Sequence, residues 1–211
     1  MSTRSELRAK ARNTLGNGIF KGPWLVAAVV FIVSSAILSI SGLTYVLPLI
    51  ITGPIMIGVY SYFLKYIRYE NELKTLDPLF DGFKNDIVGN ILVYILQSIF
   101  TFLWSLLFVI PGIVKMYSYA MTYYIKIDNP QMSANQAITE SRKIMDGHKM
   151  KLFLLDLSFL GWIIVSMFTF GIGLIWVIPY MQMARLHFYE EIKPKKKAKK
   201  SLFDDERAAL N

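Results

Sequence analysis

The chain has 211 residues, of which 54% are apolar or aromatic and only 18% are charged, and its formal net charge is +8. Soluble domains carry about 25% charged residues, so this composition is typical of a membrane protein. The absence of cysteine excludes disulfide scaffolds, thiolate metal sites and cysteine nucleophiles. With His148 and His187 as the only histidines, we expect no bound metal and no other cofactor.

The charged residues are concentrated in four segments of the sequence. Residues 1–23, 65–90, 126–151 and 185–211 hold 22 of the 23 basic residues and 14 of the 15 acidic ones. The three stretches between them are 41, 35 and 33 residues long, which is too long for one membrane-spanning helix of about 20 residues and suits two. Because Lys and Arg gather on the cytoplasmic side of membranes, we expect all four segments, and both termini, inside the cell.

This pattern predicts an all-α polytopic bundle of six membrane-spanning helices in three hairpins. The expected spans are residues 24–41, 44–64, 87–107, 108–126, 152–170 and 172–188. They make up a membrane domain at residues 24–190, which follows a basic N-terminal helix within residues 1–23 and precedes a basic, disordered tail at residues 191–211. One alternative stays open: residues 87–125 form one long helix and a re-entrant segment.

The N-terminal segment has the pattern of an amphipathic helix. Leu7, Ala11 and Leu15 recur every four residues among basic residues, which predicts one apolar helical face. The helix either lies on anionic lipid or anchors the first span by its positive charge. Residues 1–41 also admit a cleaved signal peptide, but their apolar stretch exceeds the usual 7–15 residues and a second one follows at once.

Two further cytoplasmic helices are predicted from their start signals. Asp77-Pro78 is typical of a helix start, with proline at the first helical position. Ser133 and Gln136 have the spacing of a capping box, and Gly147 is placed to end the helix that follows them. Neither helix is long enough to span the bilayer, so we expect both to pack at the inner face.

The C-terminal tail carries a dense run of lysines directly after the last expected span. Near a membrane surface each cation is attracted to anionic lipid by about 1 kcal/mol. The residues expected to contact anionic lipid are Lys195, Lys196, Lys197, Lys199 and Lys200. The run contains no aromatic side chain, so nucleic acid is not an expected partner. A second copy of the chain or another membrane protein is a further candidate partner.

Only two charged residues, Lys115 and Asp156, lie outside the four charged segments. Charged side chains within a bilayer are costly and usually face the interior of a helix bundle, so both are candidates for a ligand site. Neighbouring tyrosines offer aromatic walls and hydroxyl groups to a phosphate or carboxylate. The candidate ligand-binding residues are Lys115, Tyr117, Tyr119, Tyr123, Tyr124 and Asp156. Alternatively, Lys115 reaches the outer headgroups and Asp156 pairs with Lys149 or Lys151.

Known kinds of intramembrane enzyme fit the sequence poorly. An aspartyl protease needs two carboxylates that share a proton, and Asp156 is the only acidic residue within the expected spans. The HExxH and P-loop motifs are also missing. We therefore predict no catalytic residue. The small residues Gly53, Gly58 and Gly161 within the spans predict close helix packing instead.

Several short motifs in the second half of the chain resemble a known family. They are Ile110-Pro-Gly-Ile-Val-Lys115, Tyr117-Ser-Tyr119, Asp128-Asn-Pro130, Met145-Asp-Gly-His-Lys149 and Gly171-Ile-Gly173. With these motifs the chain resembles the DUF975 family of uncharacterised integral membrane proteins, found mostly in Gram-positive bacteria. It is more distantly similar to the membrane domain attached to some glycerophosphodiesterases. The resemblance implies a multi-pass protein of the bacterial plasma membrane and supplies no activity.

Two functions of different classes are compatible with these features. The first is non-enzymatic binding or transport of a lipid or small amphipathic solute at the Lys115 and tyrosine cluster. The second is a membrane scaffold or regulatory protein that acts through its basic cytoplasmic face.

Overall fold

The computed structural model describes residues 2–16, 24, 27–29, 32, 35, 47–68, 76–107, 109–169 and 171–194. Over these residues all regular elements are helical, which confirms the all-α fold class there. In chain order they are α1 (Arg4–Leu15), α3 (Leu47–Arg68), the 3-10 helix η1 (Asp77–Phe80), α4 (Asp81–Lys84), α5 (Ile87–Leu107), α6 (Val109–Ser118), α7 (Thr122–Asp128), α8 (Ala134–Ile144), α9 (Lys149–Leu157), α10 (Leu160–Phe168) and α11 (Leu174–Ile192). Most of the expected first span, the start of the second and the lysines at 195–200 lie outside the described residues.

Three described stretches are long and apolar enough to cross a bilayer. They are Leu49–Arg68 in α3, Ile87–Leu106 in α5, and Lys149–Phe168, which α9 and α10 form together. Only 17% of the α5 stretch and 22% of the α9–α10 stretch is buried within the protein, against 61% of the α3 stretch. Long apolar helices that face outward need a hydrocarbon environment, so these features fit a membrane protein.

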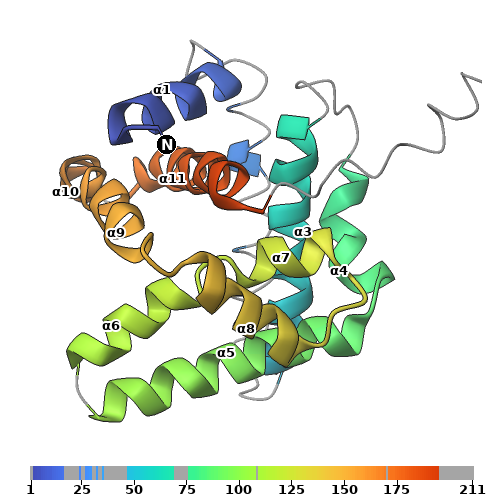
Figure 1. Cartoon of the computed structure of the whole chain (residues 1–211). Coiled ribbons are helices and arrows are strands. Elements are labelled where there is room, and N and C mark those ends of the chain that lie inside the picture. The colour runs from blue at the N-terminus through green and yellow to red at the C-terminus, as the bar shows by residue number, and fades with distance from the viewer. Residues whose placement is uncertain are drawn as a thin grey trace, which may run out of the picture.

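Helices α5 and α6 lie side by side, joined at their ends by a single residue (Figure 1). The outward side of this pair is strongly apolar. Its large exposed side chains include Phe102, Leu103, Leu106, Ile110 and Val114. Helix α10 also has exposed apolar side chains, among them Trp162, Val165 and Phe168.

The stretch predicted as one span at residues 108–126 is interrupted. Helix α6 ends at Ser118 and α7 begins at Thr122, and Ser141 of α8 fills the gap. The Ser141 hydroxyl accepts from the Met121 backbone N–H (3.2 Å) and donates to the Ser118 carbonyl oxygen (2.8 Å). Because Ser141 is fully buried, these bonds satisfy backbone groups that the interruption frees.

A second interruption separates α9 from α10 at Ser158 and Phe159. The Phe159 side chain is fully buried, and its ring meets the Tyr180 ring of α11 edge-on, with centroids 4.9 Å apart. The Ser158 hydroxyl donates to the Leu155 carbonyl at 2.6 Å. Neither interruption contains glycine or proline, which explains why the sequence pattern did not predict them.

The predicted N-terminal amphipathic helix is confirmed as α1, and it lies against α11 (Figure 1). Its apolar face, formed by Leu7, Ala11 and Leu15, is buried in the main core. A capping box between Thr3 and Glu6 starts the helix. Protein, rather than lipid, therefore covers the apolar face of α1.

Of the two other predicted helix starts, the one before α8 is confirmed, whereas η1 already begins at Asp77, so Pro78 is its second residue and not its first. Proline lies in the first turn of η1, and Ser133 and Gln136 form both hydrogen bonds of a capping box before α8. Gly147 lies between α8 and α9. Its φ of +73° favours glycine and cannot continue a right-handed helix. The apolar residues Ala134, Ala137 and Ile138 of α8 are buried beneath the bundle.

Two of the three predicted close contacts at glycines are present. A Cβ atom on Gly58 would lie 1.9 Å from the Leu79 carbonyl oxygen, and one on Gly53 would lie 2.3 Å from the Asn90 carbonyl oxygen. The backbones of α3, η1 and α5 approach closely at these points. At Gly161 the prediction is wrong, since a Cβ atom there would have no described neighbour within 4 Å and the adjacent Trp162 is 52% exposed.

Candidate ligand-binding site

A bidentate ion pair joins α9 and α11 at the second helix interruption. Arg185 donates from Nε to Asp156 Oδ1 (2.8 Å) and from Nη2 to Oδ2 (2.7 Å). The side chains of Asp156 and Arg185 are 11% and 31% exposed. The Tyr117 hydroxyl of α6 donates a third hydrogen bond to Asp156 Oδ2 at 3.0 Å. The carboxylate is therefore held in place by charge and by two neighbouring helices.

The ion-pair partner of Asp156 is thus Arg185, not a residue that the sequence pattern had proposed for it. Lys149 instead lies 3.7 Å from Asp146, and the Lys115 ammonium lies 4.2 Å from the centre of the Trp104 ring. Lys115 and Asp156 therefore have different partners in the structure and do not pair with each other.

The candidate tyrosines divide among three environments. Tyr117 joins Asp156, whereas the buried Tyr119 packs near Phe100 of α5, with ring centroids 6.4 Å apart. Tyr123 and Tyr124 of α7 both contact the Tyr60 ring of α3, at 5.4 and 4.9 Å. Tyr60 was not among the predicted site residues, although its ring contacts two of them, Tyr123 and Tyr124.

This aromatic cluster connects the ion pair to the charged residues near Asp128. Tyr124 stacks on Tyr189 of α11, with ring centroids 5.1 Å apart and planes at 22°. The Tyr189 hydroxyl then donates to Asp128 Oδ2 at 2.8 Å. Tyr60 and Tyr124 both lie close enough to Arg185 for electrostatic interaction. A chain of polar and aromatic side chains therefore runs from Asp156 and Arg185 to Asp128.

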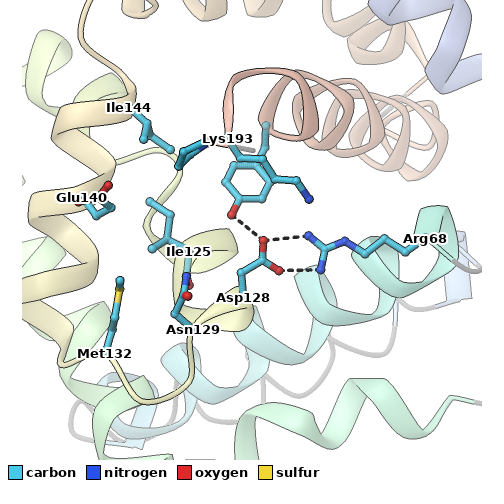
Figure 2. Close-up of a pocket in the computed structure, with 10 residues that line it drawn as sticks. Arg68, Ile125, Asp128, Asn129, Met132, Glu140, Ile144 and Lys193 are labelled. Atoms are coloured by element: carbon cyan, nitrogen blue, oxygen red, sulfur yellow. Dashed lines mark hydrogen bonds and ion pairs between the residues drawn. The ribbon is translucent and has the colours of Figure 1, made fainter. Parts of the chain in front are cut away.

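A pocket of about 500 Å³ lies beside Asp128, at the end of this series of side chains. It is lined by Arg68, Ile125, Asp128, Asn129, Met132, Glu140, Ile144, Tyr189, Lys193 and Pro194. Figure 2 shows Asp128 next to Arg68 on one side of the pocket, with Glu140 and Ile144 on the other side. Arg68 donates to both Asp128 oxygens, at 2.6 and 2.9 Å.

The electrostatics of the pocket keep Asp128 ionised. Burial acts to raise the pKa of its carboxyl group, but hydrogen bonds from Arg68 and Tyr189 outweigh burial and lower the pKa below its usual value. Arg68 also donates to Glu190 Oε1 at 2.8 Å, and Lys193 lies 2.5 Å from Glu190 Oε2. Charges of both signs therefore border the pocket.

The apolar lining of the pocket faces these charges. Ile125 comes from α7, Met132 from the loop that follows α7, and Ile144 from the end of α8. A cavity that both apolar and charged side chains line suits a molecule that is itself amphipathic.

A buried lysine fixes the loop beside the pocket. Lys126 is only 2% exposed, and its ammonium donates to Asp86 Oδ2 (2.5 Å), the Pro130 carbonyl (2.8 Å) and the Met132 carbonyl (2.6 Å). The hydrogen bond from Lys126 also lowers the pKa of Asp86. All three ammonium hydrogens are used, so this lysine has a structural role.

No group of three or more His, Asp and Glu side chains that could hold a metal ion occurs in the part of the chain that the structure describes. The candidate site residues described above offer charges, hydrogen-bonding groups and aromatic rings.

The comparison with protein families concerns the part of the chain that carries most of these features. A family model described as "Protein of unknown function (DUF975)" matches residues 109–196. Over these residues the chain is similar to the DUF975 family. The DUF975 region runs from α6 past the end of α11, and it contains Asp156, Arg185 and all pocket residues except Arg68. No curated protein and no solved structure matches the chain, so the similarity to glycerophosphodiesterase membrane domains gains no support.

Proposed function

We propose that this protein binds, or moves across the membrane, a lipid or another small amphipathic solute without catalysing a reaction. The observation that carries the proposal is the pocket of about 500 Å³, which both apolar and charged side chains line. The apolar part of the solute contacts Ile125, Met132 and Ile144. Its polar head lies against the charges around Asp128 and Lys193.

The proposal includes six spans in three hairpins, both termini in the cytoplasm, and a location in the plasma membrane of a Gram-positive bacterium. The contacts among the charged segments support a common side. Arg68 forms ion pairs with Asp128 and Glu190, and Lys126 forms one with Asp86. Segments far apart in the sequence thus meet at one end, as the distribution of basic residues requires.

The two interrupted helices support a role in binding or transport. Interrupted helices in membrane proteins place free backbone groups and polar side chains within the membrane, where they line cavities. Here Tyr117 precedes one interruption and Asp156 precedes the other, and the two side chains hydrogen-bond to each other. We propose that the Asp156–Arg185 pair and the tyrosines form the end of the solute path that lies within the membrane.

The test is native mass spectrometry of the full-length protein purified in mild detergent. Ile144→Trp fills the pocket, whereas Ile164→Trp makes the same change on the exposed side of α10. We expect a ligand retained by the wild type and by Ile164→Trp and lost from Ile144→Trp. Absence of any ligand from the wild type, or equal retention by Ile144→Trp, contradicts the proposal.

A membrane scaffold or regulator is the second candidate, and one observation favours it. Arg142 and Lys143 are exposed at the end of α8, and Lys149 and Lys151 follow at the start of α9. Replacement of Lys195, Lys196, Lys197, Lys199 and Lys200 by Gln separates the candidates. A scaffold loses its partners with this change, whereas a protein that binds a solute in the pocket retains its ligand.

A further inference from the structure

A second cavity lies between the N-terminal helix α1 and the interruption between α9 and α10. Its volume is about 330 Å³. It is lined by Thr3, Arg4, Ser5, Arg8 and Ser158. None of these residues lines the pocket near Asp128, so the two cavities are separate.

The two arginines of this cavity differ from the paired cations described above, because neither has a carboxylate partner in the part of the chain that the structure describes. Arg4 and Arg8 are four residues apart in α1, so their side chains lie on the same helical face. Neither forms an ion pair with a carboxylate in the described ranges. In contrast, the buried Lys126 and the partly buried Arg185 are both paired with carboxylates.

Arg8 is the more informative of the two. Its Nε atom is buried and has no hydrogen-bond partner among the described residues. Its guanidinium group lies over the Phe159 ring, 5.6 Å from the ring centre, which fixes the group beside the helix interruption. Arg8 lines the cavity and has no carboxylate partner among the described residues, so an anion bound there would supply its counter-charge.

The surface next to the cavity is apolar. Leu157 and Leu160, on either side of Ser158 and Phe159, are each 47% exposed, and Trp162 further along α10 is 52% exposed. A guanidinium group binds two phosphate oxygens at once, and two such groups one helical turn apart fit one phosphate. A phosphate that carries acyl chains would place its head on the arginines and its chains on α10.

We infer that Arg4 and Arg8 form a binding site for the phosphate group of an anionic phospholipid. The Thr3 and Ser5 hydroxyls border the same cavity and complete its polar side. The inference rests on the membrane location in the proposed function, but not on any ligand of the pocket near Asp128.

The experiment titrates phosphatidylglycerol onto the full-length, detergent-purified protein and measures binding by native mass spectrometry. Arg4→Gln/Arg8→Gln is compared with Lys10→Gln/Arg12→Gln, which removes the same charge from exposed positions of α1 outside this cavity. We expect the first variant to lose affinity at least tenfold, and the second to stay within about twofold of the wild type, since a lost bidentate contact outweighs a change in overall charge. Unchanged thermal unfolding of both variants shows that α1 remains folded.

Two results overturn the inference. Equal loss of affinity in both double variants means a diffuse attraction of lipid to α1. Displacement of phosphatidylglycerol by inorganic phosphate at equal concentration means a site for a soluble anion. Ile144→Trp separates this inference from the proposed function, because it removes the pocket ligand and leaves phosphatidylglycerol binding at α1 intact.

Discussion

The outer surface of α5 and α10 and the charged end of the molecule near Asp128 have opposite composition. Along α5 and α10, large apolar side chains such as Phe102 and Phe168 are 63% and 83% exposed. Near Asp128, by contrast, charged side chains are packed between helices, and the Asp128 side chain is only 14% exposed. On α5 and α10 the apolar side chains face outward, whereas near Asp128 the charged side chains are packed within the protein.

This difference follows from a change of solvent. In water, a continuous exposed apolar surface is unfavourable, whereas in hydrocarbon it costs nothing. Charges behave in the opposite way, because in hydrocarbon they must be paired or brought to the membrane surface. The two regions can therefore be perturbed separately, and the expected losses of stability differ in size.

The largest effect is expected at the Asp156–Arg185 pair. Asp156→Ala leaves the Arg185 guanidinium without its counter-charge in a site where it is only 31% exposed. Breaking a buried ion pair in this way costs about 3–5 kcal/mol. The melting temperature in detergent should therefore fall strongly, and Asp156→Ala/Arg185→Ala should lose less than the sum of the two single changes.

The exposed pair between Glu140 and Lys143 is the control for this prediction. Its side chains are 32% and 69% exposed, and exposed pairs contribute about 0–1 kcal/mol. Glu140→Ala should therefore change the melting temperature little. Equal losses from Asp156→Ala and Glu140→Ala would show that the pair between α9 and α11 is not buried.

A smaller effect is expected from glycine substitution in the two apolar helices. Gly58→Ala places a Cβ atom 1.9 Å from the Leu79 backbone, so α3 and η1 must move apart. Overpacking of this kind costs about 1–3 kcal/mol. Gly161→Ala makes the same change where no described atom lies within 4 Å, and we expect no loss of thermal stability. The prediction fails if the two variants unfold at the same temperature.

The smallest effect concerns the pH dependence of stability through Asp128. Its pKa is lowered in the folded protein, so the ionised carboxylate stabilises the fold above the unfolded pKa of about 3.9. This stabilisation is lost as the pH falls through the lower, folded pKa. Asp128→Asn removes the charged partner of Arg68 and should cost about 1.5 kcal/mol at pH 7.

Thermal unfolding between pH 7 and pH 3 tests this sign. The difference in melting temperature between the wild type and Asp128→Asn should be largest at neutral pH and should shrink on acidification. A difference that grows as the pH falls would show that the carboxyl group is not stabilised in its ionised form.

Much of the local structure could be predicted from the sequence, because it depends on short-range patterns. The bounds of α5 agree with the expected span at residues 87–107, and the capping box at Ser133 and Gln136 is present. These features follow from apolar length and from side chains three residues apart. The Arg185 partner of Asp156 was missed because their contact depends on how α9 packs against α11.

A signal for that pair was nevertheless present in the sequence. Arg185 lies within the expected span at residues 172–188, as Asp156 does within 152–170, so each was a lone charge in a neighbouring span. The pocket near Asp128 could not be predicted in the same way, since its lining comes from α3, α7, α8 and α11. The periodicity of apolar residues in a sequence does not indicate which ends of four helices lie together.

The most direct test of the membrane arrangement uses the natural absence of cysteine in this chain. Lys84→Cys and Lys143→Cys place single thiols at exposed positions of two charged segments, and Thr169→Cys places one at the end of α10. In intact cells, a membrane-impermeant maleimide should label only Thr169→Cys, and permeabilised cells should show labelling at all three. Labelling of Lys84→Cys or Lys143→Cys from outside intact cells would contradict the account.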